Sequence, residues 1–186
     1  MGIVYMRTRG ARRERKGTLK EMISKDVLCL HMRYARWAAE RILEAAATLT
    51  PAELTHDFQT SEKHVTGTLA HTFAADRVWW HRVRRAPLEK FIDPEKDFRL
   101  ETLRAEWPAL LLQWEEFLAA QDESALAGKI EYKDLKGNSH TTPLWQIVLH
   151  VVNHGTHHRG QVSGMMRAQG HVPPPLDLIA FYRTLG

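Results

Sequence analysis

The stretch at residues 150–161, HVVNHGTHHRGQ, contains four histidines within nine positions. On an α-helix, residues four apart lie on the same face, so His150, His154 and His158 would form a row. The surrounding segment 143–170 is rich in apolar residues and helix formers, and it is bounded by a proline and a glycine. We therefore predict a long helix here with a row of imidazoles along one side.

Three earlier segments also predict long helices. In the first of them, apolar residues recur at spacings of three and four, as expected of a helix with one side in a core. Thr60 or Ser61 is suited to cap the second helix, which we expect Pro87 to end. Pro108 is expected to kink or split the third helix. The predicted spans are residues 19–49, about 60–87 and about 98–121.

Shorter elements are expected between and after these helices. Residues 50–54, TPAEL, are typical of the end of one helix followed by the capped start of another, with Pro51 at its first helical position. In residues 129–142 the side chains alternate in character on both sides of the Gly137-Asn138 pair, which predicts a short β-hairpin. The predicted fold class is all-α: a four-helix bundle with a short β-hairpin before the fourth helix and a short C-terminal helix that packs back on the body.

Length and composition indicate a single globular domain. The chain has 186 residues, of which 44% are hydrophobic and 26% charged. Its one cysteine, Cys29, excludes an internal disulfide and a cysteine-rich metal site. No apolar run approaches the length of a membrane span and no signal-peptide core is visible, so we expect no membrane association and a cytoplasmic location.

Positive charge is concentrated at the N-terminus. Residues 1–20 hold seven of the 26 Lys and Arg and only one of the 22 acids, so the remainder carries a small negative balance. We expect residues 1–18 to be a basic, disordered tail, or an extension from an upstream start codon, and residues 19–186 to be one metal-binding domain. A nucleic-acid partner is disfavoured because the domain itself offers no basic stripe.

The histidine spacing points to a metal site inside the bundle. The second helix offers His64 and His71, seven apart and so on one face. Two histidines four apart on the fourth helix and one from a facing helix would supply three nitrogen ligands, as in open catalytic zinc sites. HGTHH is not HExxH, so the glutamate base of zinc proteases is missing. On the second helix, His81 lies beyond the repeat of His64 and His71. Four others are expected to be surface or hydrogen-bonded residues: His31, His56, His140 and His171.

Three separated motifs resemble one known family. NHGTHHRGQ, TLAHTFAADRVWW and PPPLDLIAFYR together are similar to the DinB family (DinB/YfiT-like metalloenzymes), in order and spacing, from about residue 22 to the end. The resemblance implies a four-helix bundle of unusual connectivity that is often dimeric and holds a divalent metal with three histidines. Carried over to this chain, the metal ligands are His71, His154 and His158, which leaves His150 and His157 as neighbours.

The chain departs from the family pattern on the first helix and before the second. Relatives often have YNRWAN where this chain has YARWAA, so Ala35 and Ala39 replace asparagines that could line or brace a pocket. His64 stands where relatives tend to have serine, and could be an accessory group of the site. The better understood relatives use the metal to activate a low-molecular-weight thiol in transferase or isomerase reactions.

Several polar residues near the ligand turns have two interpretations. Arg77, Arg159 and Gln161 could bind anions or orient the ligand imidazoles, or they could belong to a solvated helix face. Asp76 could accept a hydrogen bond from a ligand nitrogen or pair with an arginine. Trp80 could cover a pocket, although packing in the core is the more common role of a helical tryptophan.

Two classes of function follow from this site. The first is a metal-dependent enzyme, a hydrolase or a thiol-dependent S-transferase, that activates water or a low-molecular-weight thiol for a small-molecule substrate. Nitrogen donors favour zinc or nickel over magnesium or calcium. No catalytic residue and no organic cofactor site can be assigned. The alternative is a non-catalytic metal-binding protein, inducible by stress or DNA damage, that acts through interactions.

Consecutive leucines on the third predicted helix indicate self-association. Leu110, Leu111 and Leu112 cannot all point toward the core of their own bundle, because a helix turns only one side inward. An apolar side chain that faces outward often marks an interface, and two-fold pairing is its commonest form. We therefore expect a homodimer, unless Pro108 distorts the helix or the C-terminal segment covers the exposed leucine.

Overall fold

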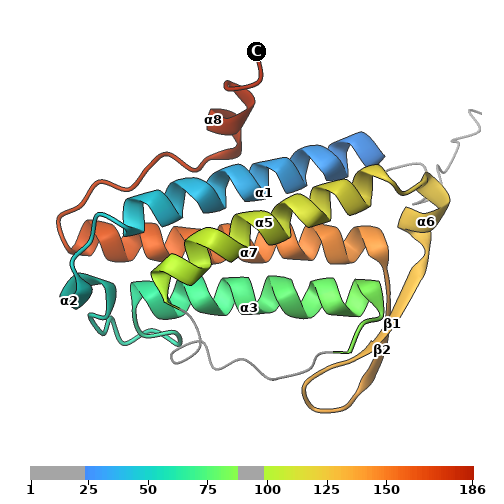
Figure 1. The fold of residues 1–186 in the computed structure, drawn as a ribbon, viewed down its shortest axis with the longest axis horizontal. Helices are drawn as coiled ribbons and strands as arrows, with labels where there is room; N and C mark the ends of the chain where they lie inside the picture. Colours follow the sequence, from blue (N-terminus) through green and yellow to red (C-terminus); the bar gives the residue numbers. More distant parts are fainter. Residues whose placement is uncertain (1–23, 88–98) are drawn as a thin grey trace, which may run out of the picture.

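Four long helices make up most of the computed structural model, which describes residues 24–87 and 99–186 (Figure 1). The expected tail, residues 1–18, and the connection at 88–98 lie outside the described residues. The long helices are α1 (Lys25–Ala46), α3 (Val65–Arg84), α5 (Leu100–Ala119) and α7 (Leu144–Ala168). The short elements are α2 (Pro51–Leu54), α6 (Glu123–Ala127), α8 (Leu178–Tyr182), and the strands β1 (Lys129–Lys133) and β2 (Ser139–Pro143).

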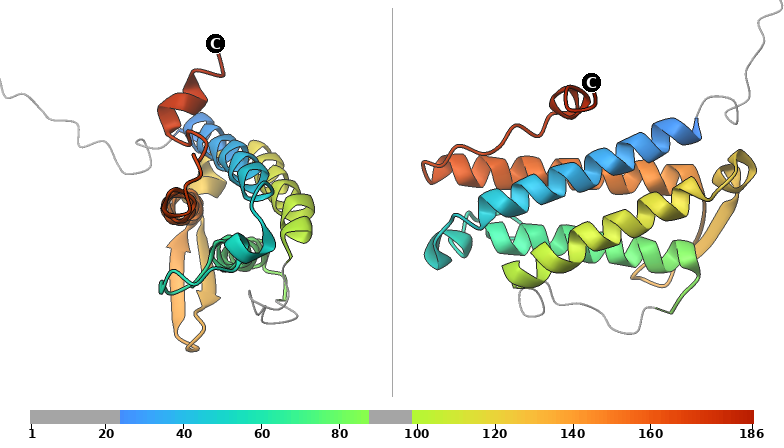
Figure 2. Two further views of the ribbon diagram at one scale, coloured as in Figure 1. Left: turned by 90° about the vertical axis from the view of Figure 1, so that its left-hand side faces the viewer. Right: turned by 45° about the horizontal axis from the view of Figure 1, so that its top comes forward.

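The long helices form a bundle in which each packs against two others. α1 contacts α5 and α7, and α3 contacts the same two helices from the opposite side (Figure 2). The colours of Figure 1 show that α3 and α5 run in the same direction, although they follow one another in the sequence. The predicted four-helix bundle is therefore confirmed, with a connectivity that differs from simple up-and-down order.

The predicted hairpin and C-terminal helix are also present. β1 and β2 pair antiparallel, with Tyr132 opposite His140, and Gly137 takes the positive φ of 87° that the turn requires. At the other end of the chain, Phe181 of α8 is buried against Tyr34 and Trp37 of α1. None of the described helices is both long enough and apolar enough to span a membrane.

The core lies between the four helices and is rich in large side chains from α3 and α5. Trp107, Trp114 and Phe73 are buried almost completely. Ala35 and Ala39 of α1 are 3% and 0% exposed, so the two positions that depart from the family pattern belong to this core. Their small side chains favour close helix packing and supply no polar group to a pocket.

The ends of the second long helix differ from the prediction. α3 begins at Val65, because His64 rather than Thr60 or Ser61 is the N-cap: its Nδ1 accepts a hydrogen bond from the Gly67 N–H at 2.9 Å. His64 is therefore a capping residue of the helix. The helix ends at Arg84 rather than at Pro87, because Arg85 adopts a left-handed conformation with φ 52°.

α5 is continuous from Leu100 to Ala119, so Pro108 does not split it. The ring removes one backbone donor, but the helix on both sides is held by buried side chains of the core, Leu103 and Trp107 before it and Leu111 and Trp114 after it. Tertiary packing thus outweighs the local cost of the proline.

Candidate metal centre

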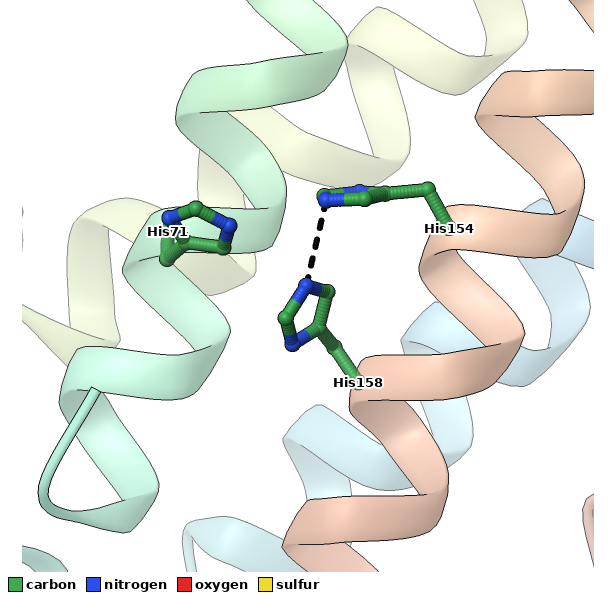
Figure 3. Close-up of side chains that lie close together, drawn as sticks. All are labelled: His71, His154 and His158. Atoms are coloured by element: carbon green, nitrogen blue, oxygen red, sulfur yellow. Dashed lines mark hydrogen bonds between the residues drawn. The ribbon is translucent and has the colours of Figure 1, made fainter. Parts of the chain in front are cut away.

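Three histidines from two facing helices converge at one point. α3 supplies His71, and α7 supplies His154 and His158 (Figure 3). One ring nitrogen of each lies within 4.8 Å of those of the other two. The predicted ligands are thus brought together, and within the described residues no fourth His, Cys, Asp or Glu joins the group.

The two histidines of α7 are held one helical turn apart with their outer nitrogens facing. Nε2 of His154 and Nε2 of His158 are 3.1 Å apart (Figure 3). The other nitrogen of His158, Nδ1, lies 2.7 Å from Oε1 of Gln161, an atom that can only accept a hydrogen bond. Nδ1 must therefore carry the proton, which leaves the lone pair on Nε2 directed toward the other rings. Gln161 therefore lies where it can orient this predicted ligand.

His71 has a carboxylate beside it. Nδ1 of His71 is 3.6 Å from Oε2 of Glu62, and its side chain is 34% exposed. Glu62 lies in a tight turn before α3, where Gln59 and Lys63 both have a positive φ of 59°. Such strained conformations are retained where the surrounding structure requires them. This turn places the carboxylate at the site.

Burial favours the neutral form of His154 and His158. It is the main cause that lowers the pKa of His154 to about 3, and the neighbouring His158 and His71 lower it further. Burial also lowers the pKa of His158, although the hydrogen bond to Gln161 opposes this effect. Neutral imidazole is the form that binds metal ions. Three converging nitrogen donors therefore make a possible binding site for a metal ion.

The other two histidines of α7, His150 and His157, lie at the margin of the cluster. The ring of His150 packs against Trp79, 5.2 Å between centroids, and burial followed by the charge of Arg82 lowers its pKa. His157 is exposed and contacts the ring of His158. Neither belongs to the group of converging ligand atoms.

The histidines expected to be unrelated to the site have local partners. His31 bonds the backbone oxygen of Val27, His140 contacts Asp134, and His171 contacts Glu53. His56 packs edge-on against Phe58.

Asp76 and Arg159 belong to the core beneath the site rather than to its ligand shell. Asp76 accepts a hydrogen bond from Nε1 of Trp107 at 2.8 Å, and it bonds no ligand histidine. The buried Arg159 guanidinium lies over the ring of Tyr34, 5.5 Å from its centroid. Of the two roles open to Asp76, the one directed at a ligand nitrogen is wrong.

Arg77 and Trp80 contact aromatic side chains. The guanidinium of Arg77 lies 5.7 Å from the ring centroid of Phe73. Trp80 packs edge-on against Trp114 and Phe117, and it also lines a small cavity between α3 and α5.

Comparisons with known proteins agree with the fold. The family model "DinB family" matches residues 22–184. Protein DinB of Bacillus subtilis (strain 168) is 25% identical over 150 residues, which is 77% of this chain and 87% of that protein. The crystal structure of a DinB-like protein from Bacillus cereus ATCC 10987 matches with a TM-score of 0.58 and 20% identity, over 77% of this chain and 91% of that one. This chain belongs to the DinB family.

Proposed function

We propose that His71, His154 and His158 bind one divalent metal ion, zinc or nickel, and that the protein is a metal-dependent enzyme of the hydrolase or thiol-dependent S-transferase type. The observation that carries this proposal is the convergence of three imidazole nitrogens within 4.8 Å at a partly exposed point between α3 and α7. Three protein ligands leave room for a small molecule, as in catalytic rather than structural zinc sites.

The residues around the metal would have distinct roles in the reaction. A divalent ion held by neutral ligands supplies the positive charge that acidifies water or a thiol at neutral pH. Gln161 fixes the ring of His158, and Glu62 faces the Nδ1 side of His71, so that both rings keep one orientation. Glu62 is also the nearest described carboxylate to the three rings, which suits it to hold a proton that the substrate or nucleophile releases.

Metal content is the first test. Wild-type protein should contain about one zinc or nickel per chain by mass spectrometry of the digested protein, and His154→Ala should contain almost none. His157→Ala is the matched control, because His157 is a neighbour outside the converging group and should leave the metal content unchanged. A wild-type metal content in His154→Ala would disprove the ligand assignment.

Activity is the second test. We would measure hydrolysis of para-nitrophenyl acetate and conjugation of glutathione or cysteine to monochlorobimane, with and without a chelator. Turnover that is lost with the chelator, restored by the metal and absent in His154→Ala supports the enzyme. Stoichiometric metal with no turnover on either type of substrate contradicts these two reaction types.

A further inference from the structure

A cavity lies on the side of α7 that faces away from the three histidines of the candidate metal centre. Its volume is about 760 Å³, within the range of small-molecule sites. Its lining comes from α7, from α1 and from the C-terminal segment at 173–178, and includes no residue of α3. Figures 1 and 2 show this segment returning from the end of α7 along α1. On α7, the lining residues Thr156, Gly160 and Ser163 lie about half a turn from His154 and His158. The cavity is therefore separate from the candidate metal centre.

A buried cation forms part of the cavity wall. Arg159 is 3% exposed, and its Nη2 donates to Oγ1 of Thr156 at 3.1 Å. Its Nε has no hydrogen-bond partner among the described residues, although Tyr34 and the carboxyl of Asp76 offset part of its charge. A buried guanidinium that is not fully hydrogen-bonded is costly. An anion in the adjacent cavity would reduce this cost.

Gly155 makes room for that guanidinium. A Cβ at this position would lie 2.6 Å from Nη1 of Arg159. Glycine inside a helix costs about 1 kcal/mol relative to alanine, so the close approach gives a structural reason for the residue.

The rim and the walls define the chemistry of the ligand. Arg167 at the rim makes no side-chain hydrogen bond or ion pair within the part of the chain that the structure describes, and the lining holds two arginines against one acid, Asp177. The apolar part of the wall includes Leu149, Leu176 and three consecutive prolines, and Asn153 and Ser163 add polar groups to it. A Cβ at Gly160 would meet no atom within 4 Å, so the missing side chain there leaves the space open.

We infer that this cavity binds a small organic anion with an apolar body and a carboxylate end. The carboxylate matches guanidinium donors in charge and geometry, and the apolar body matches the leucine and proline walls. The basic N-terminal segment of the chain itself is unsuited to the cavity, since it carries the same charge as the two arginines.

Decanoate is a suitable probe for calorimetric titration of the full-length protein. We expect saturable binding of one molecule per chain, binding of decanol at least about tenfold weaker, and no binding of decyltrimethylammonium. Gly160→Leu should abolish binding because its side chain fills the cavity. Gly164→Leu, one turn further on and outside the lining, should bind as wild type does. Arg167→Gln should weaken decanoate by about tenfold and leave decanol unchanged.

Three results would overturn the inference: no binding of decanoate below its micelle concentration, equal binding of the three probes, or equal binding by folded Gly160→Leu. His154→Ala distinguishes this site from the metal centre, because the variant should no longer bind metal but should still bind decanoate. Loss of decanoate in His154→Ala would show that the carboxylate binds at the metal instead. A change in oligomeric state in Gly160→Leu, with no decanoate bound by wild type, would identify the cavity as a contact between chains.

Discussion

The rings of the candidate metal centre are held from behind by two acceptor side chains. Gln161 accepts from Nδ1 of His158, and Glu62 lies beside Nδ1 of His71. Such partners fix the tautomer of a ligand imidazole and so prepare the other nitrogen for the metal. They are single side chains, and their contribution can be measured one at a time.

Removal of the Gln161 acceptor should weaken metal binding without removing a ligand. We expect Gln161→Leu to raise the Kd for zinc by about 10- to 100-fold, measured by competition with a chromogenic chelator. Gln161→Glu retains an oxygen acceptor and should restore most of the affinity. Equal losses in both variants would indicate a general effect on the helix rather than the positioning of His158.

Asp76 should make the stability of the fold depend on pH. Burial raises the pKa of its carboxyl to about 7, against the hydrogen bond from Trp107 and the charge of Arg159. Since the folded state then holds the proton more tightly than the unfolded state, this group contributes less stability as the pH rises from about 4 to above 7. One carboxyl oxygen, Oδ1, has no hydrogen-bond partner among the described residues, which makes the charged form costly.

Asp76→Asn tests this dependence, because asparagine keeps an acceptor for Trp107 and cannot ionise. The unfolding free energy of the variant relative to wild type should increase between about pH 5 and pH 8, as measured by urea denaturation. A difference that stays constant over this range would show that Asp76 does not titrate there.

At the scale of the elements, the start of α3 determines where Glu62 lies. A Cβ at Gly67 would collide with the backbone oxygen of Glu62, and a backbone atom cannot move aside as the end of a side chain can. The glycine therefore permits the turn that brings the carboxylate to His71. The His64 cap on the same turn bonds the N–H of this glycine.

Glycine-to-alanine replacements on two helices should have opposite effects. Gly67→Ala should lower the unfolding free energy by about 1 kcal/mol or more, because the turn must shift. Gly164→Ala in α7, where a Cβ meets no atom within 4 Å, should raise it by about 1 kcal/mol through helix propensity. Urea denaturation of both variants would test the pair, and a stabilised Gly67→Ala would contradict the role of the turn.

At the scale of the whole molecule, an apolar side chain of α5 remains uncovered. Leu110 and Leu111 are buried, whereas Leu112 is 43% exposed, so the expectation that one of the three faces outward is confirmed. Pro108 does not distort α5 enough to bury Leu112, because the helix is continuous. The C-terminal helix α8 does not cover Leu112 either, because it packs on α1. The association of two chains through this face stays a prediction.

Analytical sedimentation at micromolar protein concentration tests whether two chains associate through this face of α5. We expect a species of about twice the chain mass of 21.4 kDa. Leu112→Asp should shift it to the monomer. Leu135→Asp is the control, since Leu135 is 71% exposed at the end of the hairpin, far from α5 in the fold (Figure 1). A single species near the chain mass that is unchanged by dilution would rule out the dimer.

The sequence by itself determined the local features of this protein. Apolar spacing, helix-forming composition and boundary residues predicted the four long helices. The Gly-Asn pair predicted the hairpin, and Thr50 with Pro51 predicted the short capped helix α2. His154 and His158 could be assigned to one face because four residues make about one turn of any α-helix. These features depend on neighbours within a few positions, so no knowledge of the fold was needed.

Only the tertiary structure decided the features that join distant segments. Spacing alone left His64 and His71 as alternatives for the third ring, and the packing of α3 on α7 brings His71 to the cluster and leaves His64 as a cap. No pattern in the sequence pointed to Glu62, since a residue in an irregular turn does not belong to the repeating pattern of a helix or a strand. The cavity beside Arg159 could not be predicted from the sequence either. One of its walls is the C-terminal segment, which contacts α1 although the two lie more than a hundred residues apart in the chain. Contacts of this kind depend on how the helices dock, and hydrophobic burial, which drives docking, does not specify which polar side chains will meet.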